Sequence, residues 1–151
     1  MNTPPLPIEH IQLLLNSFAQ LLDRDLISRS GSPQDQAERL FNAAFVIISH
    51  DASPDPLLNF GNHTALMLWE MQWNAFIKTP SRMTAEPMHQ EERSQLLSRT
   101  RKYGFVDDYS GIRISNTGKR FFIEQAIVWN LTDSNGVFCG QAATFDQWKP
   151  L

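Results

Sequence analysis

The sequence is poor in cysteine. Cys139 is the only one among 151 residues, and a single thiol cannot form a disulfide within its own chain. The first ten residues, MNTPPLPIEH, also lack the basic and apolar segments of a secretory signal peptide. Both features predict a protein of the reducing cytoplasm.

Long apolar runs and clusters of basic residues are missing as well. No apolar stretch approaches the roughly 20 residues that a membrane-spanning helix needs. The chain has 13 Lys and Arg against 16 Asp and Glu, a formal charge of -3, with no basic run that could neutralise a row of phosphates. The sequence therefore predicts a soluble protein that neither enters a membrane nor binds nucleic acid directly.

The chain does have enough apolar material for one core. Hydrophobic residues make up 42% of it and aromatic residues 11%, which suffices for one domain of this length. No internal repeat or long linker divides the sequence. We predict a single domain over residues 1–151.

The first half of the sequence indicates two helices, a pair of strands and then a further helix. Apolar residues at helical spacing predict an N-terminal helix over about 7–26. Ser32 and the following proline predict the start of a second helix, which ends near Asn42. The β-branched segment 44–48 and the segment 57–60 predict two strands, and Asn62 is a suitable cap for a helix that continues through Trp73.

The second half predicts one charged helix and three strands. Thr84 is a candidate cap for a long surface helix that stops near Gly104. From residue 105 the apolar period changes to alternation, and Asn- and Gly-containing turns at 116–119 and 133–136 predict two hairpins. We therefore predict an α+β fold: a PAS-like five-stranded antiparallel sheet with helices on one face and an N-terminal helix.

Several segments, in order, resemble the MEKHLA domain family, over about Ile11 to Trp148. The segments are FNAAFVIISHD (41–51), NFGN (59–62), WEMQW (69–73), PSR (80–82), DDYSGIRIS (107–115), AIVWNL (126–131) and GQAA (140–143). The resemblance implies a PAS-like fold and a regulatory or sensory role. It implies no particular ligand or cofactor.

Two glutamines are the best candidates for ligand contacts. Gln125 and Gln141 share the strand parity of apolar neighbours, so both are expected on a buried face, where a polar group needs a ligand, water or backbone partner. Trp69, Trp73 and Trp129 are candidate walls of a cavity between the sheet and the helices. Arg113 is a further candidate, and it could also pair with Glu124 across the hairpin.

Metal and flavin sites are weaker interpretations. Glu86 and His89 share a helix face, and His50, Asp51, Asp55 and His63 combine imidazoles with carboxylates, but neither set matches a metal motif. We predict solvated or turn-capping roles for them and no metal site. Cys139 lies within a predicted strand rather than on a helix beside a flavin, so we expect a core residue; a non-covalent cofactor stays open.

The leading hypothesis is a sensory domain that binds a small molecule or a protein partner and signals through its sheet and N-terminal helix. That helix either covers the open sheet face or pairs with a second subunit, and we expect a homodimer through Ile11, Leu15, Phe18 and Leu22. One alternative is a ligand-free interaction domain. Another is a small enzyme that uses Asp107, Asp108 and His50.

Overall fold

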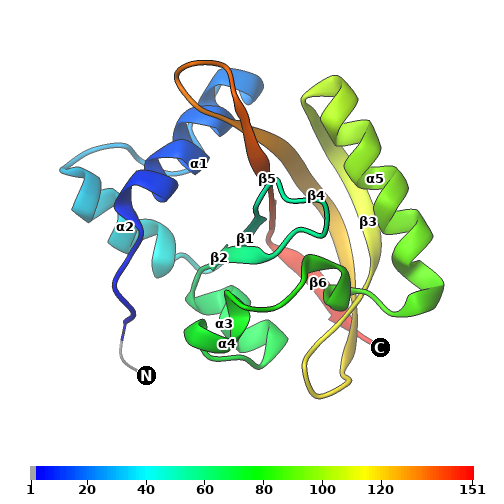
Figure 1. The fold of residues 1–151 in the computed structure, drawn as a ribbon. Coiled ribbons are helices and arrows are strands. Elements are labelled where there is room, and N and C mark those ends of the chain that lie inside the picture. Colours follow the sequence, from blue (N-terminus) through cyan, green and yellow to red (C-terminus); the bar gives the residue numbers. More distant parts are fainter. Residues whose placement is uncertain (1–2) are drawn as a thin grey trace.

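The fold is a curved antiparallel sheet with helices on both sides (Figure 1). The computed structural model describes residues 3–151. In that range the elements are α1 (Ile8–Leu22), α2 (Pro33–Phe41), β1 (Val46–His50), β2 (Leu58–Gly61), α3 (His63–Trp69), α4 (Trp73–Phe76), the 3-10 helices η1 (Ser81–Thr84) and η2 (Pro87–His89), α5 (Gln90–Tyr103), β3 (Phe105–Ile114), β4 (Arg120–Thr132), β5 (Phe138–Phe145) and β6 (Gln147–Pro150). The strand order is β2-β1-β5-β4-β3, and β6 pairs with β4. Among the described helices, none combines the length and apolar character needed to cross a membrane.

The two N-terminal helices form largely as their sequences predict. Helix α1 is shorter than the predicted range 7–26, because Asp23 adopts a left-handed conformation (φ 57°) that ends the helix. Helix α2 begins at the predicted cap. The Ser32 hydroxyl accepts from the Asp35 amide, and the Asp35 carboxylate accepts from the Ser32 amide.

Asn62 caps α3, as predicted, and also joins three elements. Its side chain is fully buried. The Oδ1 atom accepts from the Ala65 amide at 3.1 Å and from the Ile47 amide at 3.2 Å, while Nδ2 donates to the carbonyls of Leu40 and Phe45. One amide therefore ties the end of α2, the start of β1 and the start of α3 together.

The helical middle is more divided than the sequence predicts. Helix α3 stops at Trp69, because Glu70 adopts a left-handed conformation (φ 57°), and Trp73 starts the separate helix α4. The cap predicted at Thr84 is wrong: Thr84 ends η1, where its hydroxyl donates to the Ser81 carbonyl, and α5 begins at Gln90. Gly104 (φ 93°) ends α5 as expected.

Both faces of the sheet are covered. The outer face packs against α1 through residues such as Ile47, Trp129 and Leu131. The inner face, with Ile48, Val128 and Phe145, looks toward α3, η1 and α5. Helix α1 thus covers the outer face of the sheet, as the first of the two alternatives predicted for it, and α2 packs in the same cluster.

A bulge in β4 decides which side chains reach the inner face. Gln125 has φ 51°, and one extra β4 residue lies between the pairs Gly111–Ile123 and Tyr109–Ala126. Ile123 and Ala126 therefore both point inward. The part of β4 before the bulge pairs with β6, and the part after the bulge pairs with β5.

The last strand, β6, is absent from the five-stranded prediction. It occupies the edge of β4 that β5 leaves at Phe145, and Lys149 forms an ion pair with Glu124 at 3.0 Å. The predicted pair between Arg113 and Glu124 does not form, because Arg113 points to the inner face and lies opposite Phe121.

The Glu70 carboxylate fastens the β3–β4 hairpin to the end of α3. It accepts from the hydroxyls of Ser115 and Thr117 and pairs with the Lys119 ammonium at 3.0 Å. These hydrogen bonds, led by that of Thr117, lower the pKa of Glu70 to about 2.

The Glu70 contact predicts an acid-dependent loss of stability. Because its pKa is lower in the folded chain than the ordinary 4.5, the carboxylate stabilises the fold above pH 4.5, and the effect is lost as the pH falls toward 2. Glu70→Gln should therefore be less stable than the wild type at pH 7, with a difference that narrows through this window. Urea titrations at several pH values measure it, with the exposed Glu91→Gln as control; a constant difference would contradict the assignment.

A side chain at position 140 should also lower the stability of the fold. Gly140 lies where β5 passes β1, with φ 137°, and a Cβ there would overlap the His50 carbonyl oxygen. Gly140→Ala should lower the free energy of unfolding by about 3 kcal/mol. Gly136→Ala is the control, because Gly136 has positive φ but open space around it, and its cost should be about 1 kcal/mol. An equal loss of stability in the two variants would show that the close approach of Gly140 to the His50 carbonyl is unimportant.

Candidate ligand-binding cavity

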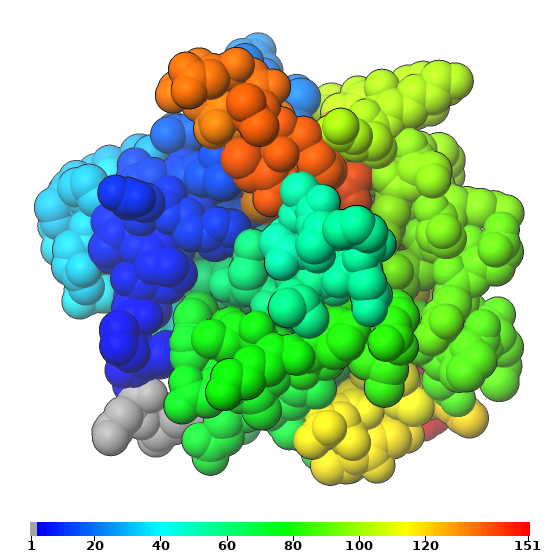
Figure 2. Space-filling view, viewed as in Figure 1, coloured from blue at the N-terminus to red at the C-terminus, as the bar shows by residue number. Residues whose placement is uncertain are grey.

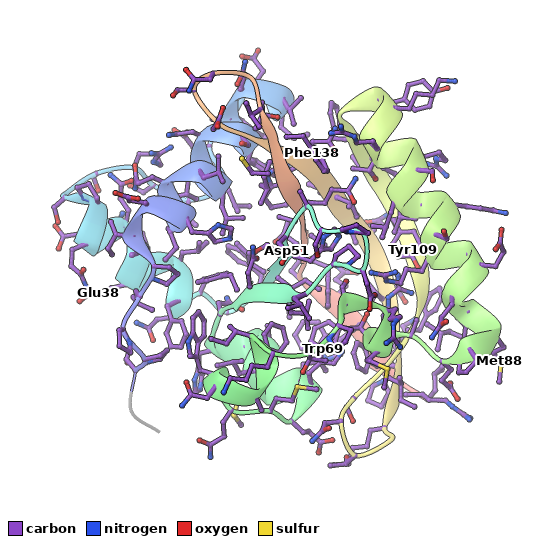
Figure 3. The ribbon with its side chains drawn as sticks, viewed as in Figure 1. Glu38, Asp51, Trp69, Met88, Tyr109 and Phe138 are labelled. Atoms are coloured by element: carbon purple, nitrogen blue, oxygen red, sulfur yellow. The ribbon has the colours of Figure 1, made fainter. Side chains whose placement is uncertain are left out.

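A cavity lies between the inner face of the sheet and the helices η1, α3 and α5. The volume open to the centre of a water molecule is about 60 Å³. This is several times what one buried water needs. Tyr109 on β3 and Trp69 on α3 contribute to its walls (Figure 3). The space therefore admits a group of small-molecule size without any movement of the backbone.

Most of the cavity wall is apolar. Trp69 closes one end and packs edge-on against Phe121 and Phe145, with ring centroids 5.2 and 6.2 Å apart. The sheet contributes small and medium side chains, among them Ile123, Ala126, Val128 and Ala143. An apolar wall of this kind is typical of sites that bind organic molecules.

Two arginines interrupt this apolar wall. Arg93 comes from α5 and Arg113 from β3, and their residues are only 8% and 7% exposed. Arg93 donates to the Ser81 hydroxyl at 2.6 Å, and Arg113 donates to the Ile112 carbonyl at 2.9 Å. Burial, and next the nearby charge of Arg113, lower the pKa of Arg93 to about 10. The Arg93 side chain therefore stays cationic at neutral pH.

Three further polar atoms on the cavity wall are buried without a hydrogen-bond partner among the described residues. They are the Tyr109 hydroxyl, Nε2 of His50 and Nε1 of Trp69. Nδ1 of His50 donates to the Asp51 carbonyl at 2.9 Å, so Nε2 of the neutral ring is an acceptor. Burial lowers the pKa of His50 and raises that of Tyr109. Both groups are therefore neutral at pH 7.

The Tyr109 ring has a space made for it by a glycine. A Cβ at Gly111 would overlap the Tyr109 hydroxyl and lie 2.7 Å from the ring carbon that carries it. The Arg113 guanidinium lies over the same ring, 5.3 Å from its centre. The glycine thus lets the phenol fold back along β3 toward the cavity and Arg113.

A surface groove leads to the cavity. It runs between the turn 51–56 and α5, and it shares His50, Arg93, Leu97 and Gln141 with the cavity wall. Figure 2 shows this turn, in teal, between the start of β5, in orange, and α5, in yellow-green. Nε2 of Gln141 donates to the carbonyl of Leu97 at 3.0 Å and to Oδ1 of Asn130 at 3.1 Å. Gln141 therefore bridges the sheet to α5 where the groove meets the cavity.

Three of the six predicted ligand-site residues line the cavity: Gln141, Trp69 and Arg113. Gln125 does not, because the bulge leaves it exposed on the outer side beside Leu26 and Ile127. Trp129 faces α1, where it packs edge-on against Phe18 at 5.0 Å. Trp73 packs against Phe60 at 5.8 Å, away from the cavity wall. The interpretation of these three as cavity residues is wrong.

Sequence reasoning missed Arg93, Tyr109 and Ser81. A signal for Arg93 exists: it shares a helix face with Leu96 and Thr100, and all three are buried. The narrow apolar face of this helix instead indicates a surface position. In the sequence, Tyr109 stands out only within the segment 107–115 that carries the family resemblance.

The structure separates the groups of the weaker hypotheses. Glu86 binds Arg120 at 2.7 Å. Asp107 and Asp108 are exposed, with Asp108 3.6 Å from Arg99, so they do not join His50 in the cavity. Within residues 3–151, no three His, Cys, Asp or Glu side chains cluster as metal ligands. Cys139 is partly buried and packs with the outer cluster rather than the cavity.

The residues proposed for a dimer interface lie on the side of α1 that faces the sheet. Ile11, Leu15 and Phe18 are at most 1% exposed because the chain's own sheet covers them, and Leu22 packs at the edge of the same cluster. A homodimer through this surface stays a prediction, and it would require α1 to leave the sheet.

The fold matches solved PAS and light-oxygen-voltage structures at low sequence identity. A PAS domain of a protein from Colwellia psychrerythraea has a TM-score of 0.64 at 15% identity, with 78% of this chain and 95% of that chain covered. An RNA-binding light-oxygen-voltage receptor has a TM-score of 0.62 at 14% identity, and the match covers 79% of this chain but only 34% of the receptor. A light-oxygen-voltage domain studied with a flavin analogue has a TM-score of 0.57 at 14% identity, covering 78% and 84%. The architecture is that of a PAS domain.

No curated protein sequence is recognisably similar to the chain. The sequence model of the MEKHLA domain, however, matches residues 8–150. The match spans all of the segments that carry the resemblance in the sequence, together with the cavity, the bulge and α1. The chain belongs to the MEKHLA domain family.

Proposed function

We propose that this chain is a sensory domain that binds a small molecule in the cavity and transmits the binding through its sheet to α1. The observation that carries the proposal is the group of unpartnered polar atoms on the cavity wall: the Tyr109 hydroxyl, Nε2 of His50 and Nε1 of Trp69. A buried polar atom without a partner costs about 1 to 3 kcal/mol. A bound molecule that supplies partners offsets this cost.

The size of the cavity limits what it can take. Its free space of about 60 Å³ is well below the roughly 300 to 1,000 Å³ typical of pockets for drug-sized ligands. We therefore propose a molecule much smaller than a flavin, although one of the similar structures was studied with a flavin analogue.

The position of α1 supports its role as the output element. Neighbouring residues of the same strands face the cavity and α1, as Val128 and Trp129 do on β4. Polar contacts also hold α1 to the sheet. The Ser17 hydroxyl accepts from the Thr132 amide at 3.1 Å and donates to its carbonyl at 3.2 Å, and His10 bonds to Ser49 on β1 at 2.9 Å. A change in sheet curvature therefore acts directly on α1.

Binding rather than catalysis is the proposed activity. The enzyme hypothesis needs Asp107 and Asp108 close to His50, and both carboxylates lie outside the cavity wall. A general base must come within hydrogen-bond reach of the proton it removes. The groups that do face the cavity are mainly hydrogen-bond donors, which suits recognition.

Native mass spectrometry of gently purified protein tests the proposal. We expect a bound mass that is lost after unfolding and refolding in clean buffer. Ala143→Phe, which places a ring in the cavity, should lose that mass while remaining folded by circular dichroism. Ala75→Phe, on the exposed side of α4, should keep it. A clean apo mass for the wild type would instead favour the ligand-free interaction domain.

The proposed output through α1 makes a separate prediction. Amide hydrogen exchange in residues 8–22 should differ by at least about fivefold between the protein as purified and the stripped protein, because an allosteric coupling typically exceeds that factor. Ser17→Ala should reduce the difference and leave the bound mass unchanged, since Ser17 contacts β4 and not the cavity. Identical exchange in both wild-type samples would remove α1 from the mechanism.

A further inference from the structure

The two cavity arginines carry an uncompensated positive charge. No carboxylate in residues 3–151 lies within ion-pairing distance of the Arg93 or Arg113 guanidinium. A buried charge without a counter-ion is strongly destabilising, and a second like charge nearby adds to that cost. A domain that keeps both arginines in one cavity wall gives up stability at this place.

The neighbouring acids do not remove this charge. Asp55 is the acid whose charge acts on Arg93, but it is exposed and forms its ion pair with Arg82 at 3.2 Å. Glu92 lies near the Tyr109 hydroxyl and is also exposed. The Asp51 carboxylate accepts from Ser53 and Leu57 within its own turn. Asp55 and Asp51 serve surface contacts, and Glu92 forms no ion pair with either arginine among the described residues, so the positive charge of the cavity stays unpaired.

The donors in the cavity suit a planar anion. Each guanidinium has five N–H groups in a rigid fork, and only one of them is used by Ser81 or Ile112, respectively, among the described contacts. The Tyr109 hydroxyl adds a neutral donor beside Arg113. Paired N–H groups of arginine match the two oxygens of a carboxylate.

The rest of the wall determines what the anion is attached to. Trp69, Ile123 and Phe145 present apolar surface in the same cavity. A bare inorganic ion would leave that surface without a partner, whereas a hydrocarbon body would bury it. The free space of about 60 Å³ limits the body to a few carbon atoms or one ring.

We infer that the cavity binds a small organic carboxylate, with its anionic end between Arg93 and Arg113 and its hydrocarbon body toward Trp69. The inference deepens the proposed sensory function and rests on it. The two arginines and the Tyr109 hydroxyl indicate the ligand class, because all three can donate hydrogen bonds to a carboxylate. Gln141, at the inner end of the groove, then lies on the access route.

Calorimetry and thermal unfolding of the stripped 151-residue chain test the ligand class. The probes are butyrate and benzoate, with butyramide and benzamide as neutral counterparts and sodium phosphate and sodium chloride as inorganic anions. We expect at least one carboxylate to bind and, at 100 times its Kd, to raise Tm by about 5 to 10 °C. Stronger binding of the amides, or of phosphate, would overturn the inference.

Arginine variants test the assigned residues. Arg93→Met and Arg113→Met should each weaken carboxylate binding by at least about tenfold, the effect of losing a charge-assisted hydrogen bond. Their Tm without ligand should equal or exceed that of the wild type, because each removes an unpaired buried charge. Arg99→Met, on the exposed side of α5 and paired with Asp108, should keep wild-type affinity.

A second variant covers the case in which the methionine variants fail to fold. Arg113→Lys keeps the charge but not the fork, and it should still weaken carboxylate binding relative to the amides. Wild-type affinity in this variant would overturn the role of Arg113.

If native mass spectrometry finds a bound neutral molecule while no carboxylate binds, the ligand class is wrong and the sensory proposal stands. If nothing binds at all, both fail.

Discussion

The single extra residue in β4 at Gln125 is the constraint on which the two-sided structure depends. In a regular strand, side chains two apart share a face, so Phe121 and Ile123 would be followed on the inner face by Gln125, Ile127 and Trp129. The bulge shifts that order by one, and Ala126 and Val128 point inward instead. Trp129 then packs with Phe18 under α1. One residue thus moves a large indole out of the cavity and supplies the centre of the outer core.

The cavity follows from this exchange of large side chains for small ones. Ala126, Val128 and Ala143 leave space in front of the central strands, and α5 lies across that space instead of filling it. A native core is normally packed without such room. The free space coincides with two buried arginines and three unpartnered polar atoms. Imperfect packing and unpaired charge in the same place are typical of a binding site, where stability is given up for function.

Features set by neighbouring residues could be predicted from the sequence, and features set by distant contacts could not. The caps at Ser32 and Asn62 and the hairpin turns depend on a few adjacent residues, and all were confirmed. The bulge at Gln125 lies where β4 changes its partner from β6 to β5, and this change of partner is not visible in the alternation of the strand. Arg93 was missed for a related reason: only the folded sheet turns one side of a charged helix into a buried one.

The same sheet connects the cavity on its inner face to α1 on its outer face. On β1, Ile48 faces the cavity and Ile47 faces α1. On β4, Val128 faces the cavity and Trp129 faces α1. Only one layer of strands therefore separates the cavity from α1. Ser17 holds α1 to β4 and His10 holds it to β1. In the proposed function, a ligand that moves the inner side chains therefore acts on α1 through these two strands. Because packed layers switch between discrete arrangements rather than deform continuously, the proposed function requires a second arrangement of α1 on the sheet, which the ligand would favour.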